Sequence, residues 1–146
     1  MKALKQLISE VMEANTTLPF DYSMRTRSRG HSSMINIHSY KSTMENKTES
    51  PDNITTTIYH HVKDNTHHID FTVNGEHTRP KSVSSDPGLA LRAFSVVIGH
   101  MLDYRKKNPR MRYLTYTSTR HDKNAYAKSR IYARLADEHG IDLRLL

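Results

Sequence analysis

The chain has 146 residues, the length of one domain that buries roughly two-thirds of the surface exposed by its unfolded chain. It contains no cysteine, which excludes a disulfide scaffold, a thiolate metal site and a cysteine nucleophile. No apolar run approaches the roughly 20 residues of a membrane span, and Glu10 and Glu13 interrupt the segment where a signal peptide would need an apolar core. We therefore expect a single domain over residues 1–146, no membrane partner and a cytoplasmic location.

The formal net charge of +7 comes entirely from the second part of the chain. Residues 1–86 hold ten Lys or Arg and ten Asp or Glu, whereas residues 87–146 hold twelve basic and five acidic residues. A basic part joined to a neutral part predicts an acidic partner, which could be a phosphate ligand, a nucleic acid or an acidic protein face.

The first part of the chain predicts one helix followed by strands. Residues 2–14 place apolar side chains three and four positions apart, as in an amphipathic helix that packs on a sheet. The period then changes to two, which predicts four antiparallel strands around residues 20–25, 34–37, 54–59 and 69–73. Asp64-Asn65 predicts a two-residue turn, and Asn74-Gly75 supplies the positive φ angles of a type I′ turn. The polar stretch 41–53 predicts a mobile connection within the domain.

The second part of the chain alternates between helix and strand. Asp86-Pro87 predicts the start of a long helix, and Asn108-Pro109 its end. Residues 111–118 are apolar or β-prone on both faces, which predicts a strand inside the sheet. A second helix is expected from about Asp122 to a C-cap at Gly140, followed by a closing strand over residues 141–146. The residues expected to face inward from this helix include Ile131, Tyr132, Leu135 and Ala136.

This order of elements predicts an α+β fold, with a mixed and largely antiparallel sheet covered by the N-terminal helix and the two C-terminal helices. Three motifs add a family resemblance: Phe94-Ser95-Val96-Val97, Tyr113-Leu114-Thr115-Tyr116 and Arg130-Ile131-Tyr132-Ala133-Arg134-Leu135. Through them the C-terminal half resembles the GNAT acetyltransferase superfamily, and in detail small phage proteins with a GNAT-like fold. The resemblance covers residues 69–146.

The resemblance implies a V-shaped cleft where the fifth strand splays from its neighbour, which holds acetyl-CoA in family members. It also implies that Tyr132 is the general acid toward the departing thiolate, with buried packing of this ring as the alternative. In the family, backbone amides of a glycine-rich loop cradle the pyrophosphate at the start of the long helix. The matching residues 79–88 lack the second glycine, Pro87 removes an N–H and Asp86 adds a negative charge. We therefore expect no bound acetyl-CoA.

A dense basic run follows the long helix. The candidate residues for binding nucleic acid or an acidic partner are Arg105, Lys106, Lys107, Arg110, Arg112, Arg120 and Lys123. Tyr104, Tyr113, Tyr116 and Tyr126 lie between or beside them and could stack on bases. A solvated helix end, which the helix dipole favours, is the alternative. Arg25, Arg27 and Arg29 alternate along a strand end and could extend the same patch.

Ten histidines raise the question of a metal site. A two-residue turn at Asp64-Asn65 would place His61 opposite His68, close enough to share a metal ion. Two ligands fall short of the three or four that zinc requires, so we expect no metal site. The alternative is a polar sheet face that gains charge as the pH falls toward about 6. No Ser-His-Asp arrangement, carboxylate pair or phosphate loop can be recognised in the sequence.

These patterns favour a GNAT-like phage protein that does not bind acetyl-CoA and acts by protein contact. Its expected role is that of a virion or host-interaction component, in the virion or the host cytoplasm. An acetyl-CoA-dependent N-acetyltransferase that uses Tyr132 is the alternative, and a nucleic-acid-binding module is a further one. The sequence leaves the partner and the oligomeric state open.

Overall fold

The computed structural model describes residues 6, 10, 15–29, 33–45, 50–75, 87–117 and 125–146. The elements with described bounds are β1 (Asp21–Arg29), β2 (Ser33–Met44), β3 (Asp52–His61), β4 (Thr66–Val73), α3 (Pro87–Lys107), β5 (Leu114–Tyr116), α4 (Ala125–Glu138) and β6 (Leu143–Leu145). They confirm the predicted α+β class and the order of helices and strands from β1 to the C-terminus.

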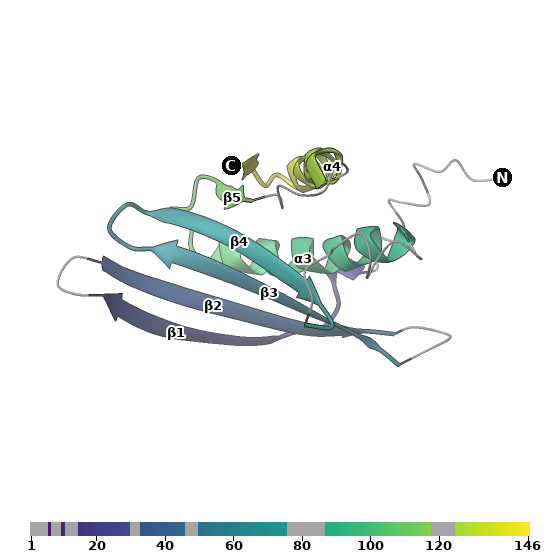
Figure 1. Ribbon diagram of the computed structural model, residues 1–146, viewed down its shortest axis with the longest axis horizontal. Coiled ribbons are helices and arrows are strands. Elements are labelled where there is room, and N and C mark those ends of the chain that lie inside the picture. The colour runs from purple at the N-terminus through teal and green to yellow at the C-terminus, as the bar shows by residue number, and fades with distance from the viewer. Residues whose placement is uncertain are drawn as a thin grey trace.

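The strands form one six-stranded sheet in the order β1-β2-β3-β4-β5-β6. The first four strands pair antiparallel, whereas β5 lies parallel to β4 and β6 lies parallel to β5. Each parallel step needs a crossover, and α3 and α4 supply the two crossovers. Figure 1 shows the long meander of β1 to β4, with α3 running along one side of it and α4 beside β5. The mixed sheet and the interior position of β5 are thus as predicted.

The core lies between α3, α4 and one face of the sheet. Phe94, Val97, Ile98 and Met101 form the buried stripe of α3, each exposed by 1% or less. Burial alternates along β4, so that its odd-numbered residues from His67 to Val73 face the helices. Each fully buried apolar side chain of this size stabilises the fold by about 1.5–3 kcal/mol.

All four strands of the meander are longer than predicted, and β2 and β3 extend into the polar stretch 41–53. Residues 41–44 continue β2 and residues 52–53 begin β3, with Lys41 paired to Thr55 and Met44 paired to Asp52. Ser42 and Met44 are buried in phase with Tyr40, so the face that packs on the helices continues through a stretch that is polar overall. The predicted connection at 41–53 therefore shortens to residues 45–51.

Two other predictions are corrected. β5 has three residues, Leu114–Tyr116, rather than the predicted span 111–118. Ile131 is 47% exposed, so its predicted inward position on α4 is wrong. Tyr132, Leu135 and Ala136 are buried and define the inner face of α4. Ile131 lies outside that face.

The turn between β3 and β4 also differs from the prediction. His61 pairs with Thr66 and His60 pairs with His67, so the turn contains four residues, 62–65, with Asn65 at φ 51°. The predicted pairing of His61 with His68 is therefore wrong, because His68 pairs with Tyr59. At the other end of β4, Asn74 and Gly75 have the predicted positive φ angles of 55° and 80°.

Several predicted features fall on residues outside those described. They are most of the helix at 2–14, the loop at 79–86, Arg120 and Lys123, and the side chain of Tyr126. The placement of the N-terminal helix on the sheet and the arrangement specific to GNAT-like proteins stay predictions. In the described ranges, neither α3 nor α4 is long and apolar enough to cross a bilayer.

Candidate functional site

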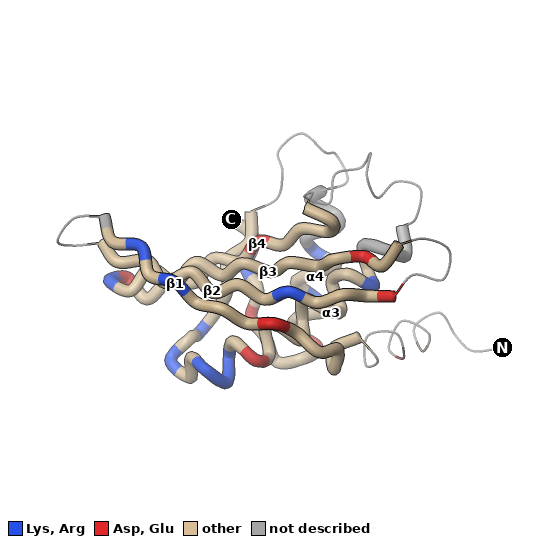
Figure 2. Tube along the Cα trace, turned by 90° about the horizontal axis from the view of Figure 1, so that it is seen from below, with Lys and Arg blue, Asp and Glu red and all other residues tan. Residues whose placement is uncertain are grey.

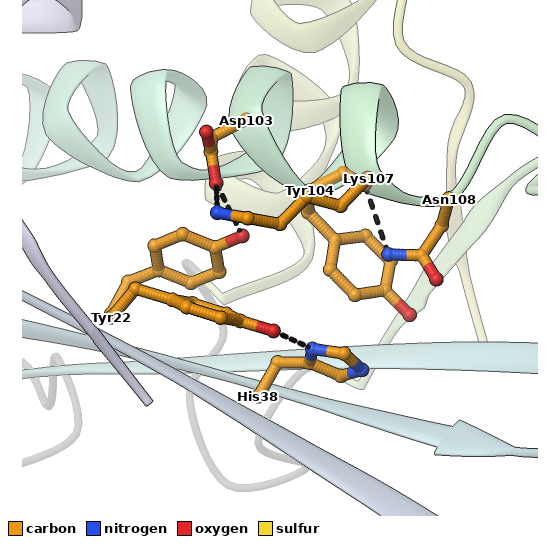
Figure 3. Close-up of polar contacts among 7 residues, drawn as sticks. Tyr22, His38, Asp103, Tyr104, Lys107 and Asn108 are labelled. Atoms are coloured by element: carbon orange, nitrogen blue, oxygen red, sulfur yellow. Dashed lines mark hydrogen bonds and ion pairs between the residues drawn. The ribbon is translucent and has the colours of Figure 1, made fainter. Parts of the chain in front are cut away.

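The second half of α3 directs polar side chains toward β1 to β4 (Figure 3). His100, Asp103, Tyr104 and Lys107 follow one another at spacings of three, one and three residues, which keeps them on one side of the helix. Their partners lie on the facing positions of β1, β2, β3 and β4, where the period of two brings every second residue to the helix. The result is a polar layer inside an otherwise apolar interface.

His100 joins α3 to β2 and β3. Its Nε2 lies 2.8 Å from Ser42 Oγ and its Nδ1 lies 2.7 Å from Thr56 Oγ1. Because the Ser42 hydroxyl donates to the Pro19 carbonyl at 2.9 Å, Ser42 accepts from His100 Nε2 and Thr56 donates to Nδ1. The ring is 1% exposed, and burial lowers its pKa to about 4, against the opposing effect of Asp103. His100 is thus neutral, both of its ring nitrogens are hydrogen-bonded, and it holds α3 against β2 and β3.

A carboxylate and an ammonium meet one turn further along α3. Asp103 accepts a hydrogen bond from the Tyr40 hydroxyl at 2.8 Å and also pairs with Lys107 (Figure 3). Burial alone would raise the pKa of the Asp103 carboxyl, but the hydrogen bonds from Lys107 and Tyr40 hold it below its ordinary value. The Lys107 ammonium also lies 3.9 Å from the centre of the Tyr22 ring, a cation–π contact. Lys107 is therefore held in place on two sides.

His38 on β2 lies beneath this pair. Its Nδ1 lies 2.7 Å from the Tyr22 hydroxyl, and its ring meets Tyr104 edge-on at 4.8 Å. Burial, His60 and Lys107 together lower the pKa of His38 to about 4. With the Tyr22 hydroxyl as donor, Nε2 carries the ring hydrogen, and it has no acceptor among the described residues. A buried donor without a partner costs about 1–3 kcal/mol.

A second pair of histidines extends the layer toward the β3–β4 turn. The Tyr104 hydroxyl lies 2.6 Å from His67 Nδ1, and His67 Nε2 lies 3.1 Å from Asn65 Oδ1. His60 Nε2 lies 3.2 Å from the same oxygen, and its ring stacks on that of His67 with centroids 4.2 Å apart. Burial, then His60 and His38, lowers the pKa of His67 to about 4. One amide oxygen thus orients two neighbouring imidazoles.

A cavity of about 460 Å³ opens beside these rings. Its lining consists of His60 and His67, of Val62 and Asn65 from the turn, of Lys107 at the end of α3, and of residues 108–111 after it. Asn65 Nδ2 donates to the Arg110 carbonyl at 3.4 Å, which ties the turn to the segment after the helix. The lining contains two cations, Lys107 and Arg110, and no carboxylate. Such a cavity suits an anionic group with an apolar stem.

Several predicted binding residues line the cavity or lie next to its lining in the sequence. We define the basic end as Lys63, Lys106, Lys107, Arg110 and Arg112, all of which are exposed. Figure 2 shows Lys and Arg of β1 and of the last turns of α3 toward the same end of the molecule. Arg105 has another task, because its guanidinium donates to the carbonyls of His139 and Gly140 at 3.3 and 2.7 Å and so caps α4.

Tyr132 lies away from the basic end, within an aromatic cluster. It is 3% exposed and stacks on Phe94 with centroids 4.3 Å apart. Phe71 and Tyr116 lie edge-on to it at 5.9 and 6.2 Å. These rings pack where β5 leaves β4, since the two strands share a single register position, His68 with Thr115. The Tyr132 ring is thus packed within the core, and its role as a general acid stays a prediction.

Comparisons with protein-family models, with curated proteins and with solved structures find no match to this chain. The resemblance to GNAT-like proteins therefore stays a prediction. Function is inferred from the geometry of the described residues.

Sequence reasoning missed the polar layer, although a signal for it exists. His38, Tyr40, Ser42 and Met44 share one phase of β2, and Ile54, Thr56, Ile58 and His60 share one phase of β3. Histidine and hydroxyl residues in phase with apolar ones indicate a buried polar network.

Among the described residues, no group of three or more His, Cys, Asp or Glu could hold a metal ion.

Proposed function

We propose that this chain is a contact protein that binds an acidic partner protein through its basic end. The observation that carries the proposal is the cavity whose lining contains Lys107 and Arg110 without a carboxylate. The exposed residues Lys63, Lys106 and Arg112 are each next in sequence to a lining residue. Opposite charge across an interface steers association and selects partners. The resemblance to small phage proteins makes a virion or host protein the expected kind of partner.

The surroundings of the basic end favour a protein partner over nucleic acid. Single strands are held by exposed aromatic rings between cations, on which the bases stack. Here Tyr104 is fully buried, Tyr113 is covered by the Arg144 guanidinium at 4.0 Å, and Tyr116 stacks on Phe71. A partner carboxylate beside Val62 and Met111 fits the mixed lining of the cavity better than a base does.

The surroundings of Tyr132 make acetyl transfer the weaker candidate. A general acid must come within hydrogen-bond reach of the leaving group. The hydroxyl of Tyr132 is buried among Phe94, Phe71 and Tyr116, in the region where the resemblance implies the cofactor cleft. Side chains that fill this region support binding rather than catalysis.

Two titrations test the proposal. A short polyglutamate chain serves as an acidic polypeptide probe, and a single-stranded oligonucleotide of matched charge serves as the competitor. We expect tighter binding of polyglutamate, because the predicted stacking rings that the structure describes, Tyr104, Tyr113 and Tyr116, are buried or covered by other side chains. Tighter binding of the oligonucleotide would instead favour the alternative that the chain is a nucleic-acid-binding module.

Acetyl-CoA is the probe for the enzymatic alternative. Isothermal titration calorimetry is expected to give no binding. Micromolar binding of acetyl-CoA would overturn the contact-protein proposal, and turnover that falls in Tyr132→Phe would then identify the acid.

A further inference from the structure

β1 forms an open edge of the sheet. It pairs with β2 at nine consecutive register positions, from Asp21 with Lys41 to Arg29 with Ser33. The strand order of the described elements gives it no second neighbour. Such an edge presents a row of backbone N–H and C=O groups that can pair with another strand. We call this row the β1 edge.

The two faces of β1 differ in chemistry. Tyr22 and Met24 pair with Tyr40 and His38, which are buried under α3, so they lie on the helix-covered face. They remain 37% and 50% exposed, and Phe20 beside them is 37% exposed. Arg25 and Arg27 pair with Ile37 and Ile35 and lie on the opposite face, also exposed. One face of the edge is thus apolar and the other is cationic.

A second copy of this chain matches the β1 edge less well than an acidic strand does. Antiparallel self-pairing centred on Arg25 or on Thr26 would place arginines opposite each other, and like charges directly opposite destabilise a strand pair. Self-pairing centred on Ser23 or on Met24 would give an acidic partner, Asp21, to only one of Arg25 and Arg27. An occupant with negative charge along the Arg25 face and apolar groups on the Tyr22 face gives both arginines a partner.

We propose that the β1 edge accepts an extended segment of a partner protein in which acidic and apolar residues alternate. Backbone hydrogen bonds provide the pairing, and the side chains provide the specificity, as in other cases of strand addition. The acidic residues meet Arg25 and Arg27, and the apolar ones cover Met24 and the Tyr22 ring. This surface adjoins the basic end at Lys107, whose ammonium lies 3.9 Å from the centre of the Tyr22 ring, but Arg25 and Arg27 are not part of the basic end.

Fluorescence anisotropy with labelled peptides tests the proposal. A peptide of alternating Glu and Val should bind, and one of alternating Lys and Val should not. Two further versions of the Glu and Val peptide are N-methylated on alternate residues, one in each phase. Strand addition predicts that one version loses binding at least tenfold while the other keeps it, because only one edge of the peptide faces β1. Equal binding of both versions would overturn the proposal.

Charge reversal separates this surface from the basic end. The double variant Arg25→Glu with Arg27→Glu should no longer bind the peptide of alternating Glu and Val, and should bind the peptide of alternating Lys and Val. Binding of the second peptide also shows that the variant is folded. Lys106→Glu with Arg110→Glu should keep the Glu and Val peptide while losing polyglutamate. If the first variant fails to exchange its preference between the peptides, the charged face of β1 does not select the partner.

Discussion

Three buried histidines, His38, His67 and His100, couple the stability of the fold to pH. Burial lowers the pKa of each to about 4, whereas an unfolded histidine titrates near about 6.5. Between these values the unfolded chain binds more protons than the native one, so stability is complete above pH ~6.5 and falls as the pH drops toward ~4. We expect urea unfolding at about pH 5 to show a loss on the order of 2 kcal/mol per histidine relative to about pH 7.5.

Two variants identify the groups responsible for that loss. His100→Gln removes one of these rings and should reduce the stability lost between about pH 7.5 and about pH 5 by on the order of 2 kcal/mol. His61→Gln makes the same substitution at an exposed position and is the matched control. An unaltered pH dependence in His100→Gln would show that His100 is not neutral in the native state at acidic pH.

At the level of the elements, the β3–β4 turn depends on Asn65. Its φ of 51° is strained for most side chains, and its Oδ1 accepts from both His60 and His67. Asn65→Gly keeps the backbone conformation but loses the hydrogen bonds, at a cost of about 1–2 kcal/mol. Asn65→Ala loses both and should cost roughly 1 kcal/mol more in the free energy of unfolding. Equal stability of the two variants in urea would contradict this role of the backbone.

The packing of residues 15–19 on α3 gives a second prediction for the elements. A Cβ at Gly99 would lie 2.4 Å from the Thr16 carbonyl oxygen, which is backbone and moves only at a cost. Gly99→Ala should therefore destabilise the protein by about 1–3 kcal/mol, although alanine favours helix by up to ~1 kcal/mol. Lys106→Ala, at an exposed position of the same helix, should stay within about 0.5 kcal/mol of the wild type in urea unfolding. A stabilised Gly99→Ala variant would rule out the close contact.

The elements also mark how far sequence alone predicts this fold. Apolar periodicity and caps predict the bounds of α3 to within one residue and the positive φ angles of Asn74 and Gly75. The four-residue turn at 62–65 is not predicted, because Asp64-Asn65 has equally good chemistry for a shorter turn. That difference moves the cross-strand partner of His60 and so conceals the stacked pair with His67. The cavity brings together two segments about 45 residues apart, a juxtaposition that no local pattern encodes.

At the scale of the whole molecule, positive charge is concentrated where the end of α3 lies beside the β3–β4 turn. The last turn of α3 and the β3–β4 turn both contribute to the basic end, although the first 86 residues carry no net charge. Exposed charges are screened within about 8 Å at physiological ionic strength. The affinity for an acidic probe should therefore fall steadily as salt is raised, with most of the loss in the association rate. An affinity for polyglutamate that is independent of salt would contradict recognition by charge.

The most direct test of the central claim is the affinity for polyglutamate of two variants with the same net charge. Lys106→Glu with Arg110→Glu reverses charge at the basic end, and Lys41→Glu with Arg134→Glu makes the same change at exposed positions elsewhere. Calorimetric titration should show a loss of roughly tenfold or more for the first variant, and little change for the second, since each exposed charge pair is worth about 0.2–1 kcal/mol. Equal losses in both variants would mean that polyglutamate responds to overall charge alone, and would contradict a binding site at the basic end.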